Sequence, residues 1–194
     1  MAGKLSPVYA FVDAAQLRSG LESIGAPWQD LSISDVALAA LPHIRRGRDG
    51  TDMVISRVWI YDAISEDDQP SSDDEAVEQW LRRNNDEMDV HVRFGRLAGD
   101  PKKAKRRRQK GVDVQLAVDA LTFASNGLFD VALFVTGDAD FAPVVEAIRD
   151  KGPRVAIFSF RSSLSPALRE VADRVGYLWE DPATYAGWKL PPAD

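Results

Sequence analysis

Apolar residues follow two alternating periodicities along this chain. In some stretches they run together or alternate with polar residues, which indicates strands, and in others they recur every three to four positions, which indicates helices. The predicted strands cover residues 8–12, 53–61, 90–94, 131–135, 154–158 and 177–179. The predicted helices cover residues 14–24, 34–41, 76–81, 112–124, 141–150 and 166–175. This alternation predicts an α/β fold, a three-layer α/β/α sandwich around a mainly parallel sheet.

The segments between these elements indicate one domain. Residues 45–50 and 65–75 are charged or serine-rich and are predicted to be loops, and Ser72 stands three positions before Glu75, the spacing of a capping box. A chain of 194 residues is long enough to bury one core. We find no repeat or linker, so we expect one domain over 1–181, followed by a surface tail at 182–194.

Composition excludes several classes of function. The chain has no cysteine, which rules out disulfides, thiolate metal sites and a cysteine nucleophile, and two histidines are too few for a histidine-rich zinc site. The first residues lack the apolar stretch of a signal peptide, and no apolar run approaches membrane-spanning length. We therefore expect a cytoplasmic protein that does not associate with membranes.

Positive charge is concentrated in one place, although the chain as a whole has a net charge of −6. This basic segment, residues 102–110, contains Lys102, Lys103, Lys105, Arg106, Arg107, Arg108 and Lys110. It predicts local attraction for phosphates, and Lys110 is the nearest of its bases to the acids described next. It has no interleaved aromatic residue, so it predicts affinity for a backbone more than choice among bases. A solvated loop and a localisation signal are alternative interpretations.

Four carboxylates occur where strands end or helices begin. Asp13 ends the first apolar run, Asp113 opens the helix at 112–124, and Asp138 and Asp140 follow the strand at 131–135. Each one alone could be a helix cap or a favourable charge in a first helical turn. In a parallel sheet, however, they would meet at the carboxyl edge and repel one another.

A hard divalent cation would relieve that repulsion. Mg²⁺ and Mn²⁺ prefer oxygen ligands, and such an ion can activate a water and neutralise charge on a phosphoryl oxygen. The four acids therefore suggest metal-dependent phosphate chemistry.

Four further residues are weaker candidates for this site. Asp62 follows the strand at 53–61 and could line the same edge or belong to a loop. Asp119 lies on a different face of its helix from Asp113 and is interpreted as a solvated or capping-network acid. Thr136 and Ser159 follow strands and could bond a phosphate or simply end those strands.

These motifs resemble the NYN-domain group of PIN-like ribonucleases, and most closely its LabA-like branch. The matching motifs are FVDAAQL at 11–17, KGVDVQLAVD at 110–119, TGDADFAPVV at 136–145 and SPALREVAD at 165–173. They occur in the family's order, and the resemblance extends over roughly 8–179. It implies a metal-dependent ribonuclease site in which the metal-binding acids are Asp13, Asp113, Asp138 and Asp140.

One position departs from the family pattern. The first motif commonly has asparagine where this chain has Gln16. A longer amide can still donate or accept hydrogen bonds, so Gln16 could contact a phosphate or a metal-bound water. Alternatively, it could lie on the helix surface.

The leading hypothesis is a ribonuclease that uses Mg²⁺ or Mn²⁺ and acts on single-stranded RNA, with DNA and a homo-oligomeric state left open. The alternative is a catalytically weak or inactive module on the same fold that binds nucleic acid or protein, which Gln16 and the acidic surface favour. A phosphatase-like hydrolase of small molecules is a third hypothesis, and the basic segment argues against it.

Overall fold

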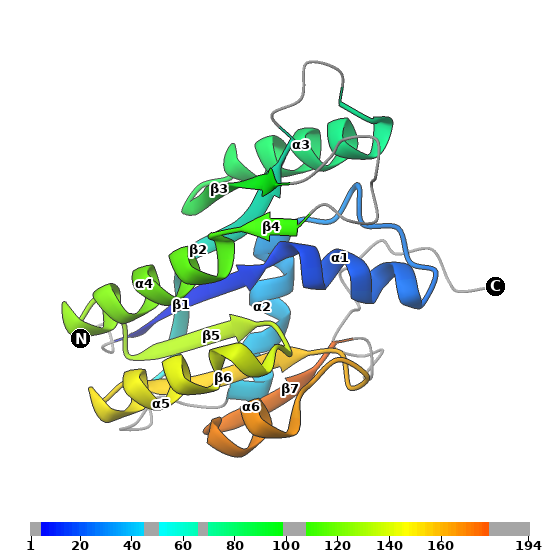
Figure 1. Cartoon of the computed structure of the whole chain (residues 1–194). Helices are drawn as coiled ribbons and strands as arrows, with labels where there is room; N and C mark the ends of the chain where they lie inside the picture. The colour runs from blue at the N-terminus through cyan, green and yellow to red at the C-terminus, as the bar shows by residue number, and fades with distance from the viewer. Residues whose placement is uncertain (1–4, 45–50, 66–69, 99–107, 179–194) are drawn as a thin grey trace.

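A computed structural model describes residues 5–44, 51–65, 70–98 and 108–178. One seven-stranded sheet runs through it in the order β4-β3-β2-β1-β5-β6-β7 (Figure 1). Its strands are β1 (Ser6–Asp13), β2 (Met53–Ile64), β3 (Val90–Ala98), β4 (Arg108–Lys110), β5 (Val131–Val135), β6 (Arg154–Ser159) and β7 (Arg174–Tyr177). Neighbouring strands are parallel except for β3 and β4, so six strands end at the same edge, which we call the carboxyl edge.

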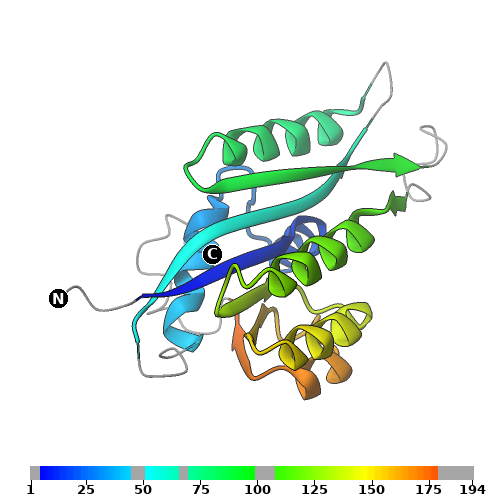
Figure 2. The same cartoon turned by 90° about the vertical axis from the view of Figure 1, so that its left-hand side faces the viewer.

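Helices cover both faces of this sheet, as Figures 1 and 2 show. They are α1 (Ala14–Ser23), α2 (Ile33–Ile44), α3 (Ser72–Asn85), α4 (Val112–Ser125), α5 (Ala142–Asp150) and α6 (Pro166–Val171), with a short 3₁₀ helix, η2 (Ala139–Phe141). The first three pack on one face and the last three on the other. The predicted three-layer α/β/α sandwich is therefore confirmed.

The central strands are apolar on both sides because both of their faces are covered. In β1, Val8 and Val12 pack beneath the helices α1 to α3, whereas Phe11 packs beneath α4. In β5, Leu133 and Phe134 point into the two opposite cores in the same way, and neither is more than 1% exposed. Alternating side chains of this kind fix which way each strand end presents its polar residues.

Strand β4 was not predicted from the sequence. Residues 108–110 belong to the basic segment, which was interpreted as lacking regular structure, yet they pair antiparallel with the end of β3. Strand β3 continues to Ala98, well beyond the predicted end at residue 94, and therefore offers an edge for this pairing.

The boundaries near the carboxyl-terminal elements also differ from prediction. Helix α6 ends at Val171 and β7 begins at Arg174, whereas a helix to residue 175 and a strand at 177–179 were predicted. The cause is Asp173, whose backbone N–H donates to the carbonyl of Val155 at 2.9 Å and whose carboxylate accepts from the Val155 N–H at 2.8 Å. These two bonds place the chain beside β6 before another helical turn can form.

The capping box of α3 lies one residue earlier than predicted. Ser71 caps the helix, and Asp74 returns the bond to the Ser71 backbone, so the Ser72 and Glu75 pairing is wrong. Both spacings occur in this acidic, serine-rich stretch, and either one begins a helix that presents Trp80 and Leu81 to the core.

Candidate active site

Asp13 ends β1 and begins α1 at the carboxyl edge. Its Oδ1 accepts a hydrogen bond from the Gln16 N–H at 3.0 Å, so the helix-cap interpretation of this residue is confirmed. Its Oδ2 lies 3.3 Å from the Thr136 hydroxyl, at the end of the neighbouring strand β5. Asp13 is only 8% exposed, and these contacts hold its carboxylate in one orientation.

The turn after β5 carries the next two acids. Asp138 accepts a hydrogen bond from the Asp140 N–H at 3.0 Å and begins η2, so Asp138 is also a cap. The carbonyl of Gly137 accepts from the Ser165 N–H at 2.9 Å. A Cβ added to Gly137 would lie 2.3 Å from the Ser163 carbonyl oxygen, so the loop after β6 leaves room only for glycine. This loop therefore holds the acidic turn in place.

Asp113 reaches the same edge by a different route. Strand β4 pairs antiparallel with the last residues of β3, so from Arg108 to Lys110 the chain runs back alongside that strand. Gly111 then adopts a φ of 81°, a left-handed conformation that glycine tolerates, and α4 begins at Val112. Asp113 consequently lies in the first turn of α4 with an exposed side chain.

The charges of the four acids interact. The pKa of Asp13 is raised to about 6, chiefly by burial and also by the negative charges of Asp113 and Asp138, while the hydrogen bonds from Gln16 and Thr136 lower it. The pKa of Asp113 is raised first by burial and then by the charges of Asp138 and Asp140.

Three separate segments of the chain therefore contribute to one negative field. Among the side chains that the structure describes, which do not include those of Arg96, Arg108 and Lys110, none of the four acids forms an ion pair with lysine or arginine. Arg18 attracts Asp13 electrostatically, but it forms its ion pair with Asp62.

Two other candidate acids have arginine partners. Asp62 is fully buried and forms a bidentate ion pair with Arg18 of α1. Asp119 accepts from the Arg93 Nε and from the Tyr61 hydroxyl, both at 3.1 Å. Neither interaction leaves a free negative charge, so ion pairing separates these two acids from the other four.

The polar candidates Gln16, Thr136 and Ser159 hold the site together. The Gln16 carbonyl oxygen accepts from the Thr136 hydroxyl at 3.1 Å and from the Gly137 N–H, and so joins α1 to the turn after β5. Thr136 has one hydroxyl proton, which serves either Gln16 or Asp13 at any moment. The Ser159 hydroxyl lies 3.2 Å from that of Ser163. Thr136 and Ser159 are each 2% exposed, so both are packed inside rather than open to solvent.

The chemistry of these four acids suits a divalent cation. The donors are carboxylate oxygens with unrelieved mutual repulsion, which Mg²⁺ and Mn²⁺ favour. In the described parts of the chain, no three Asp, Glu, His or Cys side chains are arranged so that together they could hold a metal ion. Mg²⁺ usually binds through only one or two carboxylates and keeps several waters, so pairs of these acids suit it.

Most of the basic segment lies outside the described residues. Lys102, Lys103, Lys105, Arg106 and Arg107 fall there, and only the backbone of 108–110 is described, as β4. This strand leads directly through Gly111 into α4, so the segment ends beside Asp113, as its place in the sequence predicts.

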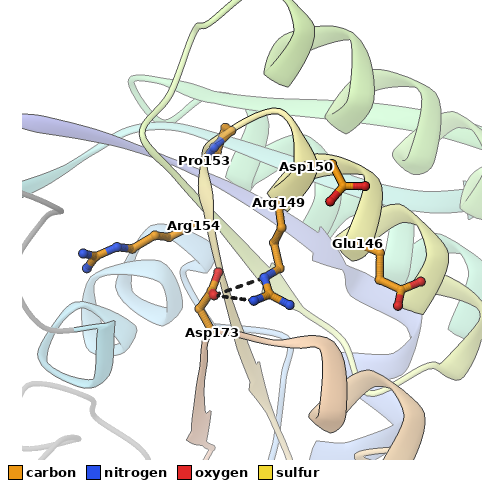
Figure 3. Close-up of a pocket in the computed structure, with 6 residues that line it drawn as sticks. All are labelled: Glu146, Arg149, Asp150, Pro153, Arg154 and Asp173. Atoms are coloured by element: carbon orange, nitrogen blue, oxygen red, sulfur yellow. Dashed lines mark hydrogen bonds and ion pairs between the residues drawn. The ribbon is translucent and has the colours of Figure 1, made fainter.

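A cavity lies at the opposite edge of the sheet, where β6 begins (Figure 3). Its volume is about 630 Å³, and it is lined by Glu146, Arg149, Asp150, Pro153, Arg154 and Asp173. Charges of both signs are present, and Arg149 bonds Asp173 at 3.0 to 3.1 Å. Because Asp173 also accepts from the Val155 N–H, its carboxylate fastens α5 to the sheet and is not available for the chemistry of the carboxyl edge.

Comparison with known proteins places this geometry in a family. The NYN domain model matches residues 8–178, which is most of the chain. The chain belongs to the NYN-domain family. The match begins in β1 and ends just after β7, so this NYN domain includes every strand that carries a candidate acid.

Two proteins are similar to this chain, and neither of their names states a function. The uncharacterized protein MJ0482 of Methanocaldococcus jannaschii is 36% identical over 70 residues, which are 36% of this chain and 29% of that protein. The matched region thus spans under a third of that relative. A crystal structure of a protein of unknown function, VPA0982 from Vibrio parahaemolyticus, superposes with a TM-score of 0.61 at 15% identity. It covers 93% of this chain and 97% of that one, so the two share the fold.

We also searched the helices for membrane spans. In the ranges that the structure describes, none is both long enough and apolar enough to cross a bilayer.

Proposed function

We propose that this NYN domain is a metal-dependent nuclease that hydrolyses RNA, as its resemblance to the LabA-like ribonucleases implies. The observation that carries the proposal is the negative field at the carboxyl edge. Asp13, Asp113 and Asp138 come from three separate segments, neighbouring carboxylates add to burial in raising the pKa values of Asp13 and Asp113, and no ion pair with a described side chain neutralises the three acids. A fold tolerates such repulsion more readily where a cation can bind.

The acids that would hold the cation are Asp13, Asp113, Asp138 and Asp140. When bound, Mg²⁺ or Mn²⁺ supplies positive charge for a phosphoryl oxygen and lowers the pKa of a water. The donor set and the charge support such binding, as does the family to which the chain belongs.

The protein's own contribution is preorganisation and access. The two hydrogen bonds to Asp13 fix its carboxylate before a substrate arrives, so little reorganisation is needed at that position. Asp113 and Asp140 are exposed and can approach a phosphate from the solvent side. Gln16 and Thr136 keep the ends of β1 and β5 together and so maintain the spacing of Asp13 and Asp138.

The basic segment supplies the remaining requirement, which is affinity for a polyanion. Seven bases at 102–110 precede Asp113 and would hold a nucleic-acid backbone close to the acids. Recognition of RNA in preference to DNA rests on the family resemblance, because no described residue identifies a 2′-hydroxyl.

A binding module without strong catalysis is the second candidate. Two observations favour it. No three acids of the described ranges are arranged so that together they could hold a metal ion, and the Gln16 carbonyl oxygen already accepts hydrogen bonds from the Thr136–Gly137 turn. This candidate predicts RNA binding that is sensitive to salt but not to chelator.

A cleavage assay separates the two candidates. Purified protein is incubated with labelled single-stranded RNA or DNA in Mn²⁺, Mg²⁺ or chelator. We expect RNA cleavage only with a metal, and a loss on the order of 100-fold or more in Asp138→Asn. The matched control is Asp173→Asn, which changes an acid that is already paired with Arg149 and should retain cleavage. Equal cleavage by wild type and Asp138→Asn would show that the activity does not belong to this site.

A further inference from the structure

Arg93 of β3 lies in the same row of the sheet as the acids. Asp13 is in register with Tyr61 on β2, and Tyr61 is in register with Arg93 on β3. Asp13 follows Phe11 by two residues, and Phe11 packs beneath α4, so Asp13 points to the α4 side of the sheet. Arg93 points to the same side, because it bonds Asp119 of α4. Two strand spacings separate Arg93 from Asp13, which is roughly 10 Å.

Helix α4 gives the same relation from its own side. Asp119, which accepts from the Arg93 Nε at 3.1 Å, lies six positions beyond Asp113, or about 9 Å along the helix axis. Strand β3 pairs on its outer side with β4, the end of the basic segment, and Figure 2 shows α4 returning beside β3 from there. Arg93 therefore lies between the acids and the basic segment, on the route of a nucleic acid held by both.

The guanidinium of Arg93 is fixed but not fully used. Only its Nε bonds Asp119, and its two terminal nitrogens form no hydrogen bond with a residue that the structure describes. The Arg93 side chain is 39% exposed. Arg18, in contrast, uses two nitrogens to bond Asp62 and is only 13% exposed. The terminal N–H groups of a guanidinium match the geometry of two phosphate oxygens, so Arg93 keeps the donors that a phosphate needs.

An aromatic layer holds this guanidinium in place. The guanidinium carbon of Arg93 lies 4.6 Å from the centre of the Trp59 ring, which is within cation–π distance. The Trp59 ring in turn packs against His91 of β3 and Phe123 of α4, with ring centres 4.6 and 5.0 Å away. Because this layer already orders the Arg93 side chain, little freedom is lost when a phosphate binds.

The ion pair with Asp119 does not cancel the positive charge at this surface. The pKa of the neighbouring His91 is lowered first by burial and then by the positive charges of Arg57 and Arg93. Asp89 raises this pKa, but by less than either arginine lowers it. A net positive field therefore remains over this part of β3 and attracts an anion.

We propose that Arg93 binds a phosphate of a single-stranded nucleic acid beside the acids, through the two terminal nitrogens of its guanidinium. This inference rests on the proposed function for the identity of the substrate, but it concerns binding and needs no metal. If Arg93 served the fold alone, breaking its ion pair from either side would have the same effect on affinity for RNA.

The test measures RNA binding in chelator, where cleavage does not interfere. The probe is a labelled single-stranded RNA of about 12 nucleotides, and fluorescence anisotropy is recorded over a range of salt concentrations. We expect Arg93→Gln to weaken binding about 5- to 20-fold. The salt slope should fall by about 0.7, as loss of one phosphate contact to a single strand predicts. Arg93→Lys keeps the charge but not the planar fork, so it should recover the salt slope and only part of the affinity.

Arg57→Gln is the matched control for position. Arg57 pairs with Asp89, is 41% exposed and lies on the same face of the sheet as Arg93. It stands four residues before Tyr61 on β2, and so roughly 13 Å farther from the carboxyl edge. Arg57→Gln should change affinity less than 2-fold. An equal loss in Arg57→Gln and Arg93→Gln would overturn the inference, because it would reflect the loss of any positive charge.

Asp119→Asn is the matched control for the ion pair. It breaks the same pair as Arg93→Gln but leaves the guanidinium in place and removes a negative charge. We therefore expect Asp119→Asn to bind RNA at least as tightly as wild type. A loss as large as that of Arg93→Gln would show that the pair acts through the fold. If Arg93→Gln does not fold, Arg93→Lys decides: reduced affinity supports the inference, and wild-type affinity overturns it.

The same protein samples distinguish this inference from the proposed function. If wild type cleaves RNA with Mn²⁺ but Arg93→Gln binds RNA as wild type does, the nuclease stands and the Arg93 site is wrong. If wild type does not cleave but Arg93→Gln loses affinity, the Arg93 site stands and the nuclease is wrong. No binding of RNA by wild type would overturn both.

Discussion

The two edges of the sheet treat acidic residues differently. At the amino edge, Asp173 is bonded to Arg149 and to the Val155 N–H, and it joins α5 to β6 and β7 (Figure 3). At the carboxyl edge, the charge of Asp138 raises the pKa of Asp113, and neither acid forms an ion pair with a described side chain. An acid that is neutralised by a neighbour contributes to the fold, whereas a group of acids left with its repulsion can attract a cation. The acids of the two edges therefore differ in whether a basic side chain neutralises them, and not only in their position.

Asp62 sharpens this comparison because it is a paired acid close to the unpaired ones. It is fully buried, and the guanidinium of Arg18 also lies within 5.5 and 5.7 Å of the Trp28 and Trp80 ring centres. Arg18→Gln leaves Asp62 buried without its counter-charge and should reduce the free energy of unfolding by about 3 to 5 kcal/mol. Urea denaturation measures this effect. In contrast, Arg82→Gln breaks an exposed pair on α3 and should cost under about 0.5 kcal/mol.

A small effect of Arg18→Gln would contradict the assignment of Asp62 to the fold. In that case Asp62 would belong with the four acids of the site, and the separation by ion pairing would not hold.

The unpaired acids should destabilise the protein when no cation is present. Because burial raises the pKa of Asp13 from 3.8 to about 6, ionised Asp13 disfavours folding, and stability is lost as the pH rises through this interval. In chelator at pH 7.5, Asp13→Asn should therefore stabilise the protein by about 2 kcal/mol, and this gain should disappear below about pH 4. Thermal or urea unfolding at the two pH values tests the sign.

The matched control for this prediction is Glu170→Gln, an exposed acid of α6. It should leave stability nearly unchanged at both pH values. If Asp13→Asn destabilises the protein at pH 7.5 in chelator, the carboxylate is stabilised by its surroundings, and the account of an unrelieved negative field is wrong.

The smallest expected effect concerns the connection between the two acid-bearing strand ends. Gln16→Ala removes the acceptor of the Gly137 N–H and of the Thr136 hydroxyl, so it should cost about 1 to 2 kcal/mol of stability. Gln16→Asn restores the amide type common in the family but is one methylene shorter. The Gln16→Asn variant should recover cleavage only if the shorter amide still reaches the turn after β5. A cleavage rate equal to wild type in Gln16→Ala would show that this connection has no catalytic role.

The sequence predicted the fold because its strongest signals are local. Buried strands such as 131–135 are apolar throughout, and helix 112–124 has apolar residues at helical spacing that are buried in the structure, so both were located correctly. The positions of Asp13 and Asp138 at the ends of predicted parallel strands, and of Asp113 at the start of a predicted helix, also led us to expect these residues at one edge.

Other features could not be predicted because they depend on contacts between distant segments. The bond from Asp173 to Val155 shortens α6, and pairing with β3 turns part of the basic segment into β4. The arginine partners of Asp62 and Asp119 lie 44 and 26 positions away in the sequence, so no spacing indicates them. The row of Asp13, Tyr61 and Arg93 likewise appears only when β1, β2 and β3 are paired.

Calorimetric titration with Mn²⁺ tests the central claim most directly, because it measures the cation itself and does not depend on a substrate. The proteins are wild type, Asp138→Asn from the carboxyl edge and Asp173→Asn from the amino edge. We expect wild type and Asp173→Asn to bind Mn²⁺ alike and Asp138→Asn to bind at least about 10-fold more weakly. Equal binding by all three proteins, or no binding by wild type, would contradict a metal site at the carboxyl edge.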